Sequence, residues 1–205
     1  MATMDELMRR SPVIPVLTVH HVADAHPLAE ALVAGGLPVL EVTLRTPTAL
    51  DVIREMTQVP GAVVGAGTVL NERDLDAAMA AGAAFAVSPG LTESLAKAAL
   101  ARNLPFLPGI STASDIMRGL DLGLDRFKFF PAVPSGGIPV LKALAGPFHQ
   151  CRFCPTGGIT ADTAAQWLAL DAVLCVGGSW LVNSGPLDTA AIKERARAAA
   201  RLRAP

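Results

Sequence analysis

The chain has no tyrosine, and aromatic residues fill only 4% of its 205 positions. Its three cysteines are too few, and odd in number, for the disulfide framework that stabilises small secreted domains. Charged residues account for 17% and the formal net charge is -1, so no strong field would attract nucleic acid or an anionic membrane. We therefore expect the partner to be a small molecule.

Long apolar runs are also missing, although hydrophobic residues make up 51% of the chain. No run approaches the ~20 apolar residues that a membrane span needs. The first ten residues mix acidic, basic and apolar side chains, so they lack the apolar centre of a secretory signal. The same mixture predicts a short amphipathic helix. With no linker or shift in composition along residues 1–205, we expect one domain. Because the first ten residues do not resemble a secretory signal, we expect a cytoplasmic location.

Short apolar runs rich in β-branched residues recur about 20 to 26 residues apart, and helical patterns lie between them. The runs are continuous rather than alternating, as expected for a parallel sheet covered on both faces. They start near Val13, Pro38, Ala62, Ala84, Pro105, Arg126, Arg152 and Ala172. Eight strand and helix units predict an α/β fold, a (β/α)8 TIM barrel with a short N-terminal helix. The competing architecture is a doubly wound open sheet.

One lysine interrupts the apolar run at residues 126–131. Lys128 could be structural, reaching water from a strand end or pairing with a buried carboxylate. It could instead be a nucleophile, because burial favours the neutral amine. Residues two apart in a strand share a face, so Lys128 and Phe130 should point inward while Phe127 and Phe129 face the helices.

In a barrel of this kind the working groups gather where strands end, and two such ends carry reactive side chains. Glu41 and Arg45 are four residues apart and share a face if the strand stays extended, as a catalytic pair or as a structural ion pair. Thr68 follows Gly65 and Gly67, so its hydroxyl could contact a ligand or cap its own turn. Pro89 lies in a stiff turn after strand four.

Two glycine pairs follow the last two predicted strands, Gly157-Gly158 and Gly177-Gly178. Bare backbone N–H groups beside a helix N-terminus form the usual phosphate site of this fold, and we expect the second pair to open a short helix. The alternative is that both pairs only make tight turns.

Several other motifs predict no chemistry. Cys151 and Cys154 form a C-x-x-C pattern in a predicted strand rather than at a helix start, which argues against redox activity. The four histidines, His20, His21, His26 and His149, show no metal-ligand spacing, so no metal is expected. Alanines interrupt the arginine-rich segment 193–203 and no aromatics accompany it, which predicts a surface helix.

Taken in order, the motifs resemble those of the bacterial 2-keto-3-deoxy-6-phosphogluconate (KDPG) and 4-hydroxy-2-oxoglutarate aldolases. The resemblance runs from about Val13 to Val182 and rests on residues 41–45, 65–68, 88–90, 108–112, 127–131, 153–158 and 177–180. It implies a class I aldolase of the Entner-Doudoroff pathway. Such an enzyme forms a Schiff base without a metal, releases pyruvate and glyceraldehyde 3-phosphate, often accepts 4-hydroxy-2-oxoglutarate, and assembles as a homotrimer.

The resemblance also implies roles for individual residues. Lys128 would form the Schiff base, Glu41 would be the acid and base, and Arg45 would bind the substrate carboxylate. Thr68, Pro89 and Phe130 would line the pyruvate end, Gly157, Gly158, Gly178 and Ser179 would hold the phosphate, and Thr156 would influence stereochemistry at C4 and favour the gluconate-type substrate. Two other functions remain open, a phosphate-binding isomerase or synthase without a Schiff base and a non-catalytic sensor of sugar-acid phosphates.

Overall fold

The computed structural model describes residues 2–183 and 185–203. The described strands pair in parallel and form two sheets, with orders β5-β4-β3-β2-β1-β9 and β6-β7-β8. They are β1 (Val13–Leu17), β2 (Val39–Thr43), β3 (Val63–Gly67), β4 (Ala86–Val87), β5 (Phe106–Leu107), β6 (Gly109–Ile110), β7 (Arg126–Phe129), β8 (Arg152–Pro155) and β9 (Val176–Gly178).

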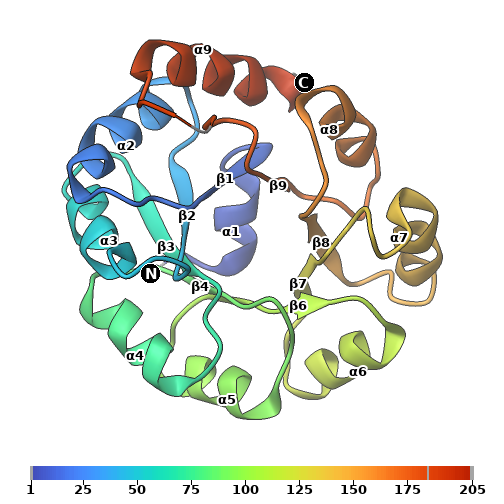
Figure 1. Cartoon of the computed structure of the whole chain (residues 1–205). Coiled ribbons are helices and arrows are strands. Elements are labelled where there is room, and N and C mark those ends of the chain that lie inside the picture. Colours follow the sequence, from blue (N-terminus) through green and yellow to red (C-terminus); the bar gives the residue numbers. More distant parts are fainter. Residues whose placement is uncertain (1, 184, 204–205) are drawn as a thin grey trace.

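Helices alternate with these strands and surround them, while α1 lies across the middle of the ring (Figure 1). The helices are α1 (Met4–Arg9), α2 (Ala25–Ala34), α3 (Ala49–Thr57), α4 (Glu72–Ala80), α5 (Glu93–Ala101), α6 (Ala113–Asp121), α7 (Gly137–Ala145), α8 (Ala161–Leu168) and α9 (Thr189–Ala200), with short 3-10 turns η1 (Val22–Asp24) and η2 (Arg201–Arg203). No helix within the described ranges is long and apolar enough to cross a membrane. The predicted α/β class and N-terminal helix are confirmed.

The fifth predicted strand is divided into β5 and β6 at Pro108. Proline has no backbone N–H to donate to a sheet ladder, although the Pro108 carbonyl still accepts from the backbone N of Lys128 at 2.9 Å. The two sheets also meet beyond their regular strands. Parallel bridges join Phe153 to Val173 and Thr156 to Gly177, so β8 lies beside the segment that leads through β9.

The apolar core has an outer layer between strands and helices and an inner layer beneath α1. In the inner layer α1 inserts Met4, Leu7 and Met8, and the latter two are 1% and 0% exposed. They belong to one cluster with side chains near the strand starts, including Ile14 and Val39. Burying each such side chain contributes about 1.5–3 kcal/mol. Helix α1 therefore covers the end of the ring where strands begin.

Asp5 attaches α1 to the strands. Its carboxylate accepts hydrogen bonds from Arg9 Nε and from Arg126 Nε, both at 2.6 Å, and Arg126 begins β7. The hydrogen bond from Arg9, followed by the bond and charge of Arg126, lowers the pKa of Asp5 against an opposing effect of burial. A carboxyl with a lowered folded pKa stabilises the fold above its unfolded pKa, and the stabilisation is lost as pH falls through the folded value.

Asp5→Asn should therefore lower the free energy of unfolding by on the order of 1 kcal/mol at pH 7, since it weakens two bonds to cations. The deficit relative to the unmodified chain should shrink as the pH falls from about 4, the unfolded pKa of Asp, through the lower folded pKa of Asp5. Urea denaturation at both pH values measures the difference. Asp171→Asn, at an exposed position, is the matched control. A deficit that is equally large at both pH values would contradict this role.

Candidate active site

Lys128 and Glu41 form a buried ion pair in the space that the strands enclose. Lys128 Nζ donates to Glu41 Oε1 at 2.8 Å and to Oε2 at 3.2 Å. The two residues are 6% and 3% exposed. Lys128 belongs to β7 in the three-stranded sheet and Glu41 to β2 in the six-stranded sheet, so the contact joins the two sheets through the interior.

Side chains alternate between the two faces of β7, and this alternation turns Lys128 toward the interior. Phe127 and Phe129, on either side of it, face outward, where the Phe127 ring centroid lies 6.3 Å from that of Phe153 and the Phe129 centroid lies 6.4 Å from that of Trp167 on α8. These flanking rings are fully buried and fix the strand parity. The predicted inward direction of Lys128 is confirmed.

Phe130 continues the inward face past the end of β7. Lys128 Nζ lies 5.5 Å from the centroid of the Phe130 ring, within the range of a cation–π contact. On the neighbouring strand, Gly109 pairs with Lys128. A Cβ atom at Gly109 would overlap the backbone of Pro89, so the turn after β4 packs closely against the lysine strand. Phe130 therefore lies beside the Lys128 amine, and the Pro89 turn packs against the strand next to Lys128.

Ser88 fixes the turn that contains Pro89. The Ser88 hydroxyl is buried and donates to the Gly90 carbonyl at 2.6 Å. This bond spans Pro89 and leaves its ring partly exposed. The sequence predicted a stiff turn at Pro89, and the Ser88 hydroxyl bond contributes to that stiffness.

Arg45 and Thr68 form a separate pair at the rim. Arg45 Nε donates to Thr68 Oγ1 at 3.2 Å, and Thr68 has a left-handed backbone with φ of 61°. Arg45 is exposed and makes no ion pair within residues 2–183 and 185–203. The structural ion pair of Glu41 with Arg45, which the sequence left open, is wrong, because the chain turns after Thr43 and the Glu41 carboxylate contacts Lys128 instead.

Gly67 lies directly against the catalytic candidate Glu41. It pairs with Thr43 in the neighbouring strand, and a Cβ atom on Gly67 would overlap the Glu41 carboxylate. The bare α-carbon therefore makes room for the carboxylate that faces Lys128. The spacing of the glycines in the sequence does not reveal which side chain approaches Gly67.

The turns that follow β8 and β9 lie side by side. Thr156 forms a bridge with Gly177, and a Cβ atom at Gly177 would overlap the Thr156 side chain. Gly157 and Gly158 have φ values of 105° and 79°, a conformation that side chains disfavour. Two glycine-containing turns are therefore neighbours in the structure.

The turn after β9 differs from the prediction in one respect. Gly178 is buried and Ser179 is exposed, but residues 179–183 make a turn rather than the expected short helix, and the next helix, α9, begins at Thr189. The Trp180 ring packs against the α-carbon of Gly178, where a Cβ would overlap it, and Leu181 is fully buried. These contacts hold the segment against the core in place of helical hydrogen bonds.

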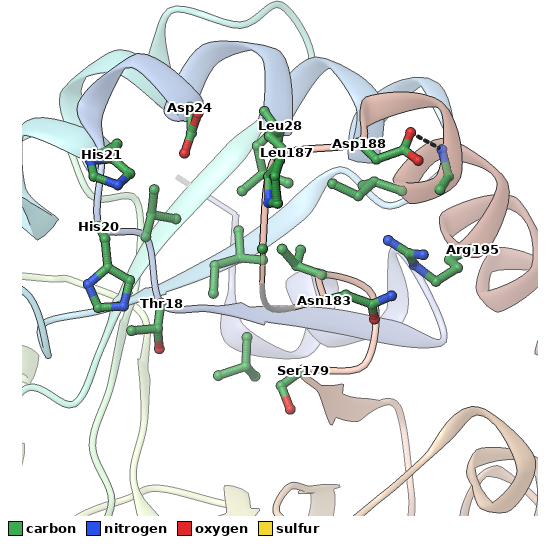
Figure 2. Close-up of a pocket in the computed structure, with 18 residues that line it drawn as sticks. Thr18, His20, His21, Asp24, Leu28, Ser179, Asn183, Leu187, Asp188 and Arg195 are labelled. Carbon is green, nitrogen blue, oxygen red and sulfur yellow. Dashed lines mark hydrogen bonds between the residues drawn. The ribbon is translucent and has the colours of Figure 1, made fainter.

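A cavity of about 660 Å³ opens beside this turn (Figure 2). It lies between the end of β1, helices α2 and α9, and residues 179–183 and 185–188. Among the described residues that line it, Ser179 is the one that the sequence predicted for the site. His20 and His21 line it as well. No group of three or more His, Cys, Asp and Glu side chains among the described residues is placed to hold a metal.

The C-x-x-C cysteines are both buried. Cys151 precedes β8 and Cys154 lies inside it, and no disulfide joins them in the part of the chain that the structure describes. Burial, with a smaller contribution from the Asp125 carboxylate, raises the pKa of the Cys151 thiol. That thiol is therefore protonated, and a poor nucleophile, at neutral pH.

Comparisons with known proteins converge on one family. A family model described as KDPG and KHG aldolase matches residues 4–196. The 2-dehydro-3-deoxy-phosphogluconate aldolase of Zymomonas mobilis is 59% identical over 199 residues, covering 97% of this chain and 96% of the relative. The crystal structure of the Zymomonas mobilis ZM4 KDPG aldolase with 3-phosphoglycerate has a TM-score of 0.96 at 58% identity, covering 98% and 96% of the two chains.

A second solved structure bears on the chemistry. The KDPG aldolase of Legionella pneumophila has a TM-score of 0.94 and 44% identity, with 97% of this chain and 98% of that chain covered. In that protein pyruvate was captured at low pH as a covalent carbinolamine intermediate.

Proposed function

Because the chain belongs to the KDPG and KHG aldolase family, we propose that it cleaves KDPG to pyruvate and glyceraldehyde 3-phosphate, and that it also cleaves 4-hydroxy-2-oxoglutarate. The observation that carries the proposal is the buried amine of Lys128, 2.8 Å from the Glu41 carboxylate at the closed centre of the molecule. An amine and a carboxylate at this distance supply both the nucleophile and the proton acceptor that a class I aldolase needs.

Lys128 begins the reaction. Its neutral amine attacks the C2 ketone to form a carbinolamine, and loss of water gives an iminium ion. When the C3–C4 bond breaks, its electron pair moves toward the positively charged nitrogen and forms an enamine, while the C4 end leaves as the aldehyde. Protonation at C3 and hydrolysis then release pyruvate and restore the amine. Since the iminium is the electron sink, the cleavage does not require a metal.

Glu41 transfers the protons. Its carboxylate accepts the proton of the attacking amine and returns it to the carbinolamine hydroxyl, which leaves as water. The regenerated carboxylate then accepts the C4 hydroxyl proton during cleavage. The protonated carboxyl then returns a proton to the enamine. Glu41 can serve these steps because both its carboxylate oxygens lie within 3.2 Å of Lys128 Nζ, the nitrogen of the Schiff base. A positioned group of this type contributes about 10²- to 10⁴-fold to the rate.

Arg45 and the residues around it recognise the pyruvoyl end. The Arg45 guanidinium binds the C1 carboxylate in a two-pronged contact, which fixes the ketone near the amine. Thr68 orients Arg45 through the 3.2 Å hydrogen bond and presents its hydroxyl to the same end of the substrate. Phe130, whose ring centroid lies 5.5 Å from Lys128 Nζ, and Pro89, which packs against the neighbouring Gly109, supply the apolar wall of this end.

The opposite end of the substrate lies at the glycine turns. Backbone N–H groups of Gly157, Gly158 and Gly178, with the Ser179 hydroxyl, bind the phosphate. Thr156 is buried between the lysine and these turns, beside Cys154 in β8, where it can contact the C4 hydroxyl. This threonine favours the gluconate-derived over the galactonate-derived substrate.

The proposal extends to the closure of the barrel, the oligomeric state and the location of the protein. Bridges between β8 and the β9 segment support a closed (β/α)8 TIM barrel that forms one domain over residues 1–205. Exposed Leu70, Met117 and Val133 offer apolar surface for a homotrimer. A cytoplasmic location is consistent with a metabolic reaction and with buried cysteines that form no disulfide among the described residues.

A coupled assay with lactate dehydrogenase, which follows pyruvate release from KDPG, tests the function directly. The purified chain should release pyruvate from KDPG, and more slowly from 4-hydroxy-2-oxoglutarate, after exhaustive chelation of metals. Binding of KDPG without cleavage would favour a sensor of sugar-acid phosphates. Conversion of a phosphorylated sugar without pyruvate would favour an isomerase or synthase, and either result would overturn the proposal.

Gly67→Ala should lower kcat by about tenfold or more, because the new methyl group displaces the Glu41 carboxylate from Lys128. Gly90→Ala is the matched control, since a Cβ atom there meets nothing within 4 Å. Steady-state assays of the two variants, with circular dichroism to verify folding, give the comparison. Equal activity of the two alanine variants would contradict the proposed contact between Gly67 and the active carboxylate.

A further inference from the structure

The turn that presents Gly178 and Ser179 has open space on one side. Ser179, Val182 and Asn183 all line the 660 Å³ cavity, so side chains do not pack against the turn from that direction (Figure 2). Packed neighbours normally hold a loop in a single conformation. This turn therefore depends on a small number of specific contacts.

The beginning of the turn is well fixed. Gly178 pairs with Pro15 in the sheet, and the Trp180 ring covers its α-carbon. Within the turn the only backbone bond between described residues is long, at 3.5 Å from the Val182 N to the Ser179 carbonyl. Beyond this bond, the later part of the turn is held by the buried Leu181 side chain and by a hydrogen bond that comes from outside the turn.

Arg195 supplies that hydrogen bond from α9. Its Nε donates to the Leu181 carbonyl at 2.7 Å, a short hydrogen bond from a charged donor. Arg195 is half-buried between the inward-facing Ile192 and Ala196, and Figure 2 shows its side chain beside Asn183 at the edge of the cavity. The sequence predicted a surface helix over residues 193–203. Its pattern could not reveal the contact of Arg195 with Leu181, because helical periodicity does not show which loop lies within reach.

The charge of Arg195 is also available to the turn. No carboxylate in residues 2–183 and 185–203 forms an ion pair with it, whereas Arg197, two residues further along α9, pairs with Glu194 at 2.6 Å and is exposed. The Asp188 carboxylate, which lines the same cavity, instead accepts from the Ala191 backbone N at 3.0 Å. Arg195 thus fixes the turn and places a positive charge beside it.

We propose that Arg195 is a positioning residue for the phosphate end of the substrate and sets the preference for phosphorylated over unphosphorylated keto acids. Its bond to the Leu181 carbonyl holds the Gly178-Ser179 segment in the conformation that binds phosphate. The inference rests on the proposed aldolase function. It predicts an effect confined to the substrate that carries a phosphate.

The test compares two substrates. Arg195→Met should raise KM for KDPG by about fivefold or more, since a charge-assisted hydrogen bond is lost. Its kcat/KM for 4-hydroxy-2-oxoglutarate, which has no phosphate, should stay within about twofold of the unmodified value. Inhibition by inorganic phosphate should weaken in parallel. Arg195→Lys should restore part of the affinity, because lysine keeps the charge and a donor.

Arg197→Met, on the same helix but away from the turn, is the control and should leave both substrates unchanged. An unaltered KM for KDPG in Arg195→Met, or equal losses for both substrates, would overturn the role of Arg195. Failure of the unmodified chain to release pyruvate from either substrate would instead overturn the proposed function. The two failures are therefore distinguishable.

Discussion

Lys128→Met should lower kcat for pyruvate release from KDPG by on the order of 10⁴-fold or more, measured in the coupled assay. Every covalent step of the proposed reaction uses the Lys128 amine, and methionine fills the same space without a nucleophile. The variant should also fail to form an adduct with pyruvate under borohydride.

The Lys128 substitution has a structural consequence that the experiment must control. It leaves Glu41, which is 3% exposed, without its cation, and breaking a buried pair in this way typically costs about 3–5 kcal/mol. Lys128→Met combined with Glu41→Gln removes both charges and should restore folding but not activity. Lys97→Met, at an exposed lysine that pairs with Glu93 on α5, should remain fully active. Substantial pyruvate release by the folded double variant would contradict the assignment of Lys128.

Glu41→Gln should lower kcat for KDPG by about 10²- to 10⁴-fold. Glutamine preserves the shape of the side chain and a hydrogen-bond acceptor near Lys128, but it cannot take up the C4 hydroxyl proton. Substrate binding should change little, so the loss should appear in kcat rather than in KM. Steady-state kinetics with KDPG give both parameters.

Glu55→Gln, an exposed position on α3, is the matched control and should behave like the unmodified chain. Full activity of Glu41→Gln would show that another group transfers the proton. In that case the contact of Glu41 with Lys128 would be a structural ion pair, the reading that the sequence also allowed.

Local patterns predicted much of the fold. The recurring apolar runs located most strands to within a few residues, and side-chain parity placed Lys128 and Phe130 on the inner face of β7. The N-caps of the helices also depend on residues close together in the sequence. Asn71 and Thr92 begin α4 and α5 by accepting hydrogen bonds from backbone N–H groups three residues further on.

Contacts across the molecule were less predictable. Glu41 and Lys128 are separated by 87 residues, and only the curvature of the two sheets brings them together. Sequence spacing instead suggested a local pair of Glu41 with Arg45, which fails because Arg45 lies on a turn beyond β2. Residues 179–183 likewise form a turn in place of the expected helix, because the Trp180 ring packs against Gly178 and the Leu181 side chain is buried in the core.

The most direct measurement is borohydride reduction of the purified chain in the presence of pyruvate, followed by peptide mass mapping. The chain has four lysines, and Lys97, Lys142 and Lys193 lie on the outer helices α5, α7 and α9. The proposed mechanism predicts one stable adduct, on the peptide that contains Lys128. An unmodified Lys128 peptide, or an adduct on any of the other three lysines, would contradict it.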